Sequence, residues 1–279
     1  MTHPNSPVIL IFCADLFFSM RIESVVQQGG FTPRVIETAE QIAPGASNVS
    51  LSTAPGEHLT GQGGALIDTV SRMQPTLMIF DMNNENLPWV DWIALLRSVP
   101  ATRRIPVLAF GSHKNVEDMT RAKDAGASAV LARSRFVSEM AHLIEKYAVI
   151  PNLAGIQEAC GDPLSALAAE GIRLFNAHEY FESHELLEDA WNEDTSEAKE
   201  LYRAILQVAV AYLQVERGNL RGALKMFLRA RQWFARLPAV CRGVNVEALI
   251  ADAAQVETAL REDGLDAVDV TTFPPVKFV

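Results

Sequence analysis

Residues 178–191, HEYFESHELLEDAW, concentrate acidic side chains and imidazoles that could do chemistry. Placed on a helix at about 100° per residue, His178, Glu182, Glu185 and Asp189 fall close to one line. Carboxylates with an imidazole suit a hard ion such as iron or manganese, so these four residues are the candidate metal ligands. The same stripe could also be an ordinary solvated helix face.

A second arc of this helix holds His184 and Glu188, one turn apart among large apolar side chains. Burying a carboxylate or an imidazole without a partner is costly, so we expect both to be paired. The next helical pattern, residues 196–216, offers Arg203 and Gln207 on one polar stripe. We therefore predict that His184 and Glu188 point inward. The expected polar network comprises Glu182, His184, Glu185, Glu188, Arg203 and Gln207.

A zinc helix is the sharper alternative. His184-Glu185-x-x-Glu188 is similar to the HExxH zinc motif, but a glutamate replaces the second histidine and no third ligand stands out. Di-metal bundles draw acids from several helices, and only one helix here is rich in them. Iron, manganese or zinc is thus the cofactor of an alternative hypothesis, a metal-dependent enzyme such as a hydrolase.

The composition of the chain limits the classes of partner that it could bind. The 279 residues carry a net charge of −10, which argues against a nucleic acid or an anionic membrane as partner. No run approaches the ~18 apolar residues of a membrane span. Cys13, Cys160 and Cys241 are far apart and odd in number, so we expect reduced thiols in a cytoplasmic protein, without a disulfide or zinc site.

The first half alternates apolar runs with helical patterns. Strands are expected at 8–12, 34–37, 77–80, 107–110 and 129–132, and helices at 20–28, 65–73, 89–96, 116–125 and 136–147. Strands buried on both faces and alternating with helices predict an α/β, doubly wound, parallel five-stranded sheet of the flavodoxin-like type. We assign this domain to residues 1–148.

Polar residues follow these strands at the edge where chemistry collects in such folds. The segments MIFDMN (78–83), PVLAFGS (106–112) and AGASAVLARS (125–134) resemble the receiver domain of two-component response regulators, over about residues 7–147. The resemblance implies that Asp81 is the phosphoryl-acceptor position. It also implies that Asn83 offers a backbone carbonyl to a magnesium ion.

The receiver pattern is incomplete in this chain. Of the acid pair that would hold magnesium, only Asp15 remains. Gly111 occupies the Thr or Ser position, with Ser112 beside it, and Arg133 replaces the lysine. Phosphoryl transfer depends on electrostatic positioning, so these losses favour a degenerate receiver that serves docking or dimerisation.

Two segments outside these elements are assigned to connections. Residues 38–64, rich in Ser, Gly and Pro, are predicted to be a flexible insertion, and the GQGG at 61–64 lacks the spacing of a phosphate loop. Residues 149–162 are predicted to be a linker.

Residues 163–279 are predicted to form an all-helical bundle with an extended tail. Asp162 is the expected N-cap of its first helix, and further helices are expected at 179–192, 196–216, 220–236 and 246–262. The composite of GIRLFNAHEYFESHELLEDAW (171–191), LQVAVAY (206–212) and RGNLRGA (217–223) resembles the bacterial "domain of unknown function 309" family over about residues 165–240. That resemblance implies a helical fold without a settled activity.

We therefore expect a non-enzymatic signalling or scaffold protein. Its receiver-like half would mediate docking or dimerisation, and its helical half would bind a protein partner. A homodimer is compatible with this hypothesis.

Overall fold

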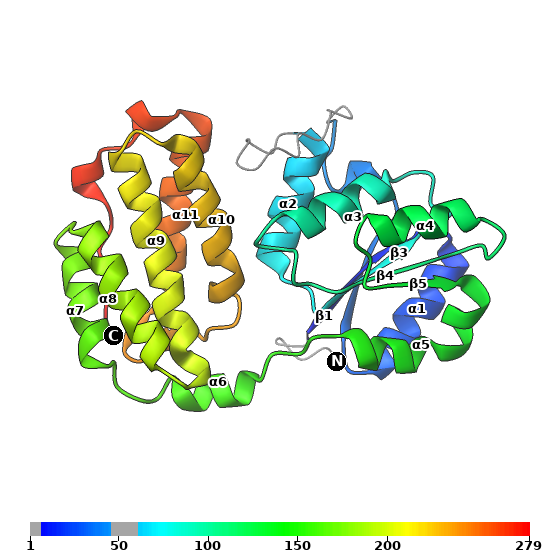
Figure 1. The fold of residues 1–279 in the computed structure, drawn as a ribbon, viewed down its shortest axis with the longest axis horizontal. Helices are drawn as coiled ribbons and strands as arrows, with labels where there is room; N and C mark the ends of the chain where they lie inside the picture. The colour runs from blue at the N-terminus through cyan, green and yellow to red at the C-terminus, as the bar shows by residue number, and fades with distance from the viewer. Residues whose placement is uncertain (1–6, 46–60) are drawn as a thin grey trace. The chain divides into compact units, whose positions relative to one another are not determined.

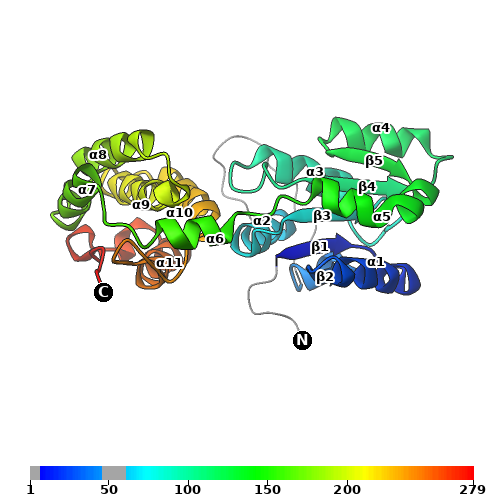
Figure 2. The ribbon, with the colours of Figure 1, turned by 90° about the horizontal axis from the view of Figure 1, so that it is seen from below.

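The computed structural model describes residues 7–45 and 61–279. The chain divides into two compact units, Met1–Ile150 and Pro151–Val279, drawn in Figures 1 and 2. Each unit has its own hydrophobic core, and we describe each by itself.

The first unit is built on a parallel sheet. Its strands are β1 (Val8–Phe12), β2 (Thr32–Ile36), β3 (Leu77–Asp81), β4 (Val107–Gly111) and β5 (Ala129–Ala132). They are ordered β2-β1-β3-β4-β5, and every neighbouring pair is parallel. This is the flavodoxin-like order, so the predicted fold class is confirmed.

Five helices flank the sheet, as Figure 2 shows: α1 (Leu16–Gln28), α2 (Gly61–Met73), α3 (Trp89–Ser98), α4 (Val116–Asp124) and α5 (Arg133–Tyr147). Apolar residues of α1 and α5 pack together against one face of the sheet. All residues of β3 and β4 are buried, as their uninterrupted apolar runs predict.

The insertion differs from the prediction at its end. Residues 61–64 form the first turn of α2, which begins at Gly61 and not at Ala65. A short 3-10 turn, η1 (Ala39–Gln41), follows β2. The rest of the expected insertion, residues 46–60, lies outside the described residues.

The second unit is mainly helical. It contains α6 (Leu153–Ala159), α7 (Ala166–Asn176), α8 (Tyr180–Glu193), α9 (Glu200–Glu216), α10 (Leu220–Phe234) and α11 (Val246–Glu262). It also contains the 3-10 turns η2 (Glu197–Lys199), η3 (Leu265–Ala267) and η4 (Val270–Thr272). Helix α9 lies between α8 and α10 and contributes nine buried residues to the core, so it is the central helix of this unit (Figure 1).

Three local predictions for this unit need correction. The N-cap of α7 is Ser165, whose hydroxyl accepts from the N–H of Ala168 at 3.1 Å, so Asp162 lies before the helix. Much of the expected linker is the helix α6, which packs on the core of this unit through Ile156. A short hairpin, β6 (Val240–Cys241) with β7 (Val244–Asn245), interrupts the helical pattern.

The extended tail is fastened to the second unit. The side-chain amide of Asn176 donates to the carbonyl of Val276 at 3.0 Å, and its oxygen accepts from the N–H of Val276 at 2.7 Å. Phe278 forms a β-bridge with Val244, and Phe273 is buried. Asn176 therefore acts as a clamp on the tail.

Candidate functional site

Asp81 lies at the carboxyl end of β3 with its carboxylate fully engaged. The residue is 3% exposed. Its Oδ1 accepts from the backbone N–H of Asn83 at 2.9 Å. Its Oδ2 accepts from the Arg133 guanidinium at 2.7 Å and faces the thiol of Cys13 at 3.6 Å. Both oxygens are thus held by groups of the protein itself.

Arg133, the first residue of α5, joins two carboxylates. Its second guanidinium nitrogen lies 3.5 Å from Oδ2 of Asp15, while the cation stacks over the ring of Phe18 with 4.5 Å to the centroid. Asp15 is also the N-cap of α1, because its Oδ1 accepts from the N–H of Phe18 at 3.1 Å. One cation therefore links the acceptor position to the start of α1.

Gly111 occupies the position where the resemblance to receivers implies a Thr or a Ser. A Cβ added to Gly111 would lie 2.8 Å from Cε of Met82, a side chain that is itself buried. The hydroxyl of the neighbouring Ser112 accepts from the N–H of Lys114 at 3.3 Å, within its own turn. The side chain of Met82 thus takes the space that a threonine at position 111 would need.

Cys13 stands beside Asp81 as a neutral thiol. Burial, and after it the negative charge of Asp81, raises the pKa of the Cys13 thiol to about 12. The thiol is therefore a weak hydrogen-bond donor to Asp81 and not a nucleophile.

A magnesium ion does not fit the residues at this edge. Magnesium requires an octahedral set of oxygen ligands, and the guanidinium of Arg133 already lies against Oδ2 of both Asp15 and Asp81. In the part of the chain that the structure describes, no group of three or more His, Cys, Asp or Glu residues could hold a metal ion.

In the second unit, the prediction that Glu188 points inward is wrong. The buried residues of α8 are Tyr180, Ser183, Leu187 and Ala190, whereas Glu188 is exposed. His184 is half-buried, and its Nδ1 contacts the carbonyl of Phe181 one turn earlier.

The close packing of α7 explains which face of α8 is buried. The hydroxyl of Ser183 donates to the carbonyl of Gly171 at 2.8 Å, and a Cβ at Gly171 would lie 2.9 Å from Cγ of Leu187. This contact turns the Ser183–Leu187 line inward. His184 and Glu188 each follow these residues by one position, about 100° further round the helix.

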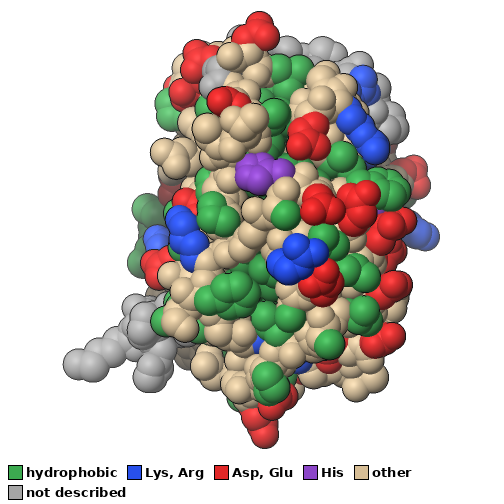
Figure 3. Space-filling view, turned by 90° about the vertical axis from the view of Figure 1, so that its left-hand side faces the viewer, with side chains coloured by type: hydrophobic (Ala, Val, Ile, Leu, Met, Phe, Trp, Pro, Cys, Tyr) green, Lys and Arg blue, Asp and Glu red, His purple; other side chains and the backbone are tan. Residues whose placement is uncertain are grey.

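The candidate metal ligands do not come together. Glu182, Glu185 and Asp189 are exposed on α8. His178 precedes the helix with φ of 63°, and its Nδ1 lies 3.1 Å from the Tyr180 hydroxyl. Figure 3 shows acidic side chains gathered on one side of the face that it presents.

Arg203 packs between two tryptophans, and the predicted contact of Arg203 with the acids of α8 stays a prediction. The guanidinium of Arg203 lies over the rings of Trp191 and Trp233, at 4.4 Å and 3.9 Å from their centroids. Oε1 of Gln207 is buried without a hydrogen-bond partner. Both tryptophans thus make cation–π contacts with Arg203.

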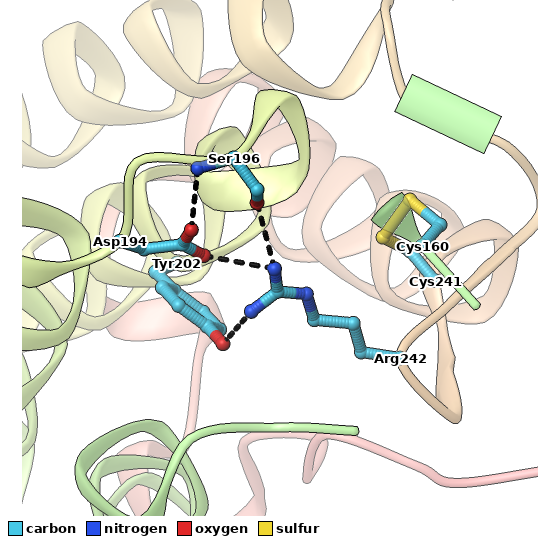
Figure 4. The surroundings of a disulfide bond; sticks show 6 residues. All are labelled: Cys160, Asp194, Ser196, Tyr202, Cys241 and Arg242. Carbon is cyan, nitrogen blue, oxygen red and sulfur yellow. Dashed lines mark hydrogen bonds and ion pairs between the residues drawn. A yellow bond between two sulfur atoms is a disulfide. The ribbon is translucent and has the colours of Figure 1, made fainter. Parts of the chain in front are cut away.

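A polar cluster around Arg242, shown in Figure 4, was not predicted from the sequence. Its guanidinium lies 2.9 Å from Oδ2 of Asp194, donates to the hydroxyl of Ser196 at 2.8 Å and also contacts the hydroxyl of Tyr202. Arg242 has φ of 52°, a backbone conformation that favours glycine.

A disulfide between Cys160 and Cys241 lies beside this cluster, so the prediction of three reduced thiols is wrong. The two residues are separated by 81 positions, and their Cα atoms lie 4.4 Å apart. No short-range spacing signals such a pair. Cys13 is the free cysteine.

Comparisons with known proteins found matches for each half of the chain. Residues 168–226 match the family profile "Domain of unknown function (DUF309)", which confirms the resemblance of the helical half. No curated protein sequence matches the chain.

Among solved structures, the first half is similar to receiver domains. One belongs to a sensor histidine kinase of Pseudomonas aeruginosa PAO1, with a magnesium ion in its active-site cleft: 14% identity, 51% of this chain and 97% of that chain, TM-score 0.38. Another is an orphan response regulator of H. pylori: 17% identity, coverage 51% and 96%, TM-score 0.36. A third is a sensor protein from Polaromonas sp. JS666: 17% identity, coverage 50% and 94%, TM-score 0.37.

No helix in the described ranges has the length and apolarity to cross a membrane.

Proposed function

We propose that this chain is a non-enzymatic regulatory or scaffold protein whose receiver-like unit is held in one state by an internal ion pair. The observation that carries the proposal is the engagement of Asp81 by Arg133, Cys13 and Asn83. A carboxylate must be free to attack a phosphodonor. Here its oxygens already neutralise a cation and accept hydrogen bonds.

Next to this ion pair, at the start of α1, lies the apolar surface that we propose for docking. Arg133 holds Asp15, the N-cap of α1, and the first turn of α1 carries exposed apolar side chains. Phe17 is 86% exposed, Leu16 59% and Met20 58%. An apolar group of this kind at the start of a fixed helix suits association with a second copy of the chain.

The outer face of α8 is our candidate for the partner surface of the helical unit. Phe181 is 43% exposed on this helix, among the exposed acids Glu182, Glu185 and Glu188. An aromatic side chain ringed by carboxylates suits a protein partner with a basic, partly apolar surface.

A cytoplasmic location stays a prediction.

The phosphorylation part is tested on the full chain with a small phosphodonor and magnesium, followed by intact-mass analysis. We expect no phosphoryl adduct on the wild-type chain, while a receiver domain with its acid pair intact gains one in parallel. An adduct that disappears in Asp81→Asn would overturn the proposal.

The docking part is tested by sedimentation equilibrium. Phe17→Ser should weaken self-association by about a hundredfold or more, because each of the two copies that meet through α1 returns one aromatic side chain to water. Val116→Ser is the matched control, because Val116 is 69% exposed at the start of α4. Equal association constants for the two variants, or a wild-type chain that stays monomeric at every concentration, would refute the α1 surface.

A further inference from the structure

The disulfide fastens the shortest helix of the second unit. Cys160 is the C-cap of α6, and Cys241 belongs to β6. Both residues are buried, with Cys160 6% and Cys241 0% exposed. Apart from Cys160, the most deeply buried side chain of α6 is that of Ile156, which is 4% exposed.

The two ends of this disulfide are held very differently. On the Cys241 side, the next residue is Arg242, whose side chain is 6% exposed and ion-paired to Asp194. The guanidinium also binds Ser196 on the approach to α9 and Tyr202 within α9 (Figure 4). Pairing of β6 with β7 adds backbone hydrogen bonds. Cys241 therefore keeps its place when the S–S bond is opened.

On the Cys160 side, a helix of two turns remains without the bond, in contact with η2 and, through Ala159 and Ile156, with the core. The carbonyl of Cys160 accepts from the N–H of Arg242 at 2.7 Å, and Ile156 stays packed on the core. Leu153, at the start of α6, is 40% exposed. A short helix with one deeply buried anchor opens at low cost.

We propose that Cys160–Cys241 is a reversible redox site whose reactants are small thiols and their disulfides, and that reduction releases α6 from the second unit. A disulfide in the cytoplasm, the compartment expected from the sequence, is typically transient and redox-sensing. The site acts independently of the function proposed above.

The chemistry is thiol–disulfide exchange. A small thiolate attacks the sulfur of Cys160, the more exposed of the two, and the S–S bond breaks. Cys241 leaves as a thiolate and takes a proton. A second small thiolate then attacks the mixed disulfide, which frees Cys160 as a thiol and forms the small disulfide. Two electrons and two protons pass from two small thiols to the protein, and oxidation by a small disulfide runs the same steps backwards.

The consequence concerns the connection between the two units. The first unit ends at Ile150, and α6 begins at Leu153. With α6 fastened, the free connection is residues 151–152. With α6 released, it extends to the approach to Leu164, which packs on the core of the second unit. The redox state would thus set the length of the tether on which the receiver-like unit is carried.

Hydrogen exchange on the full chain tests the proposal, with and without dithiothreitol, after the disulfide has been verified by intact mass and alkylation. We expect amides of α6 to exchange about tenfold faster or more in the reduced chain, with α9 unchanged. Glu-C protease should cut at Glu158 of α6 much faster in the reduced chain. Cys160→Ser and Cys241→Ser should both match the reduced chain, and Cys13→Ser should keep the redox response.

Three outcomes would overturn the proposal. The first is equal exchange of α6 in both redox states. The second is loss of protection throughout α9 on reduction, which would make the disulfide a permanent structural cross-link. The third is full alkylation of Cys160 and Cys241 after incubation with oxidised glutathione, which would show that the pair does not form.

Discussion

The ion pair between Arg133 and Asp81 gives a measurable prediction for Arg133→Met, which keeps most of the side-chain volume and removes the charge. Removing one partner of a fully buried pair costs about 3–5 kcal/mol, whereas an exposed pair is worth about 0–1 kcal/mol. Here the Asp81 side chain is 3% exposed and that of Arg133 is 36% exposed, so the pair lies between these limits. We expect the first unit to lose about 2 kcal/mol.

Native-state hydrogen exchange of β3 and β4 measures this loss separately from the second unit. A change of about 2 kcal/mol corresponds to about thirtyfold faster exchange of the best-protected amides. Arg135→Met is the matched control on the same helix, because its pair with Glu139 is exposed at 63% and 39%. That control should cost about 0.3–0.5 kcal/mol. Equal exchange in the two variants would refute the claim that Arg133 neutralises a buried charge.

Three further outcomes follow from other contacts. Since the pKa of the Cys13 thiol is raised from 9.0 to about 12, its thiolate fraction at pH 8 should fall about a thousandfold, and iodoacetamide should label it only after unfolding. The free energy of unfolding should also decline from about pH 9 upward, because the thiol ionises in the unfolded chain before it ionises in the folded one. Gly171→Ala should cost about 1–3 kcal/mol by thermal unfolding, because the backbone and side chain of Leu187 on α8 stand against it, and an unchanged melting temperature would contradict this contact. Asn176→Ala should speed hydrogen exchange of residues 273–279 by about tenfold, since it removes both bonds of the clamp, and unchanged exchange there would contradict it.

The parallel sheet could be predicted because its signal is local. Each central strand is a short run of apolar residues, and β3 and β4 end at the carboxyl edge in Asp81 and Gly111. Asp81, Asp15 and Arg133 could then be assigned to one edge, because parallel strands bring their carboxyl ends together. What the pattern could not give is the side-chain geometry, in which one guanidinium bridges both carboxylates.

The helical half shows where periodicity stops being informative. A helical wheel places His184 and Glu188 near Leu187, but a shift of one residue decides which line is buried. The neighbour that decides it is Gly171, a residue on another helix. The disulfide was missed for a related reason, since its two cysteines meet only when the chain between them has folded.

Arg133 supports the start of α1 because Asp15 makes two contacts at once. One oxygen of Asp15 caps α1 and the other meets Arg133, so the cation stabilises the carboxylate in its capping position. The guanidinium also covers the ring of Phe18, which follows the exposed Phe17 on the same turn. Any event that drew Arg133 away would leave Asp81 without its ion pair and the first turn of α1 less well held. Because the cation at this edge belongs to the chain itself, the contact that holds Asp15 in its capping position does not depend on a phosphoryl group.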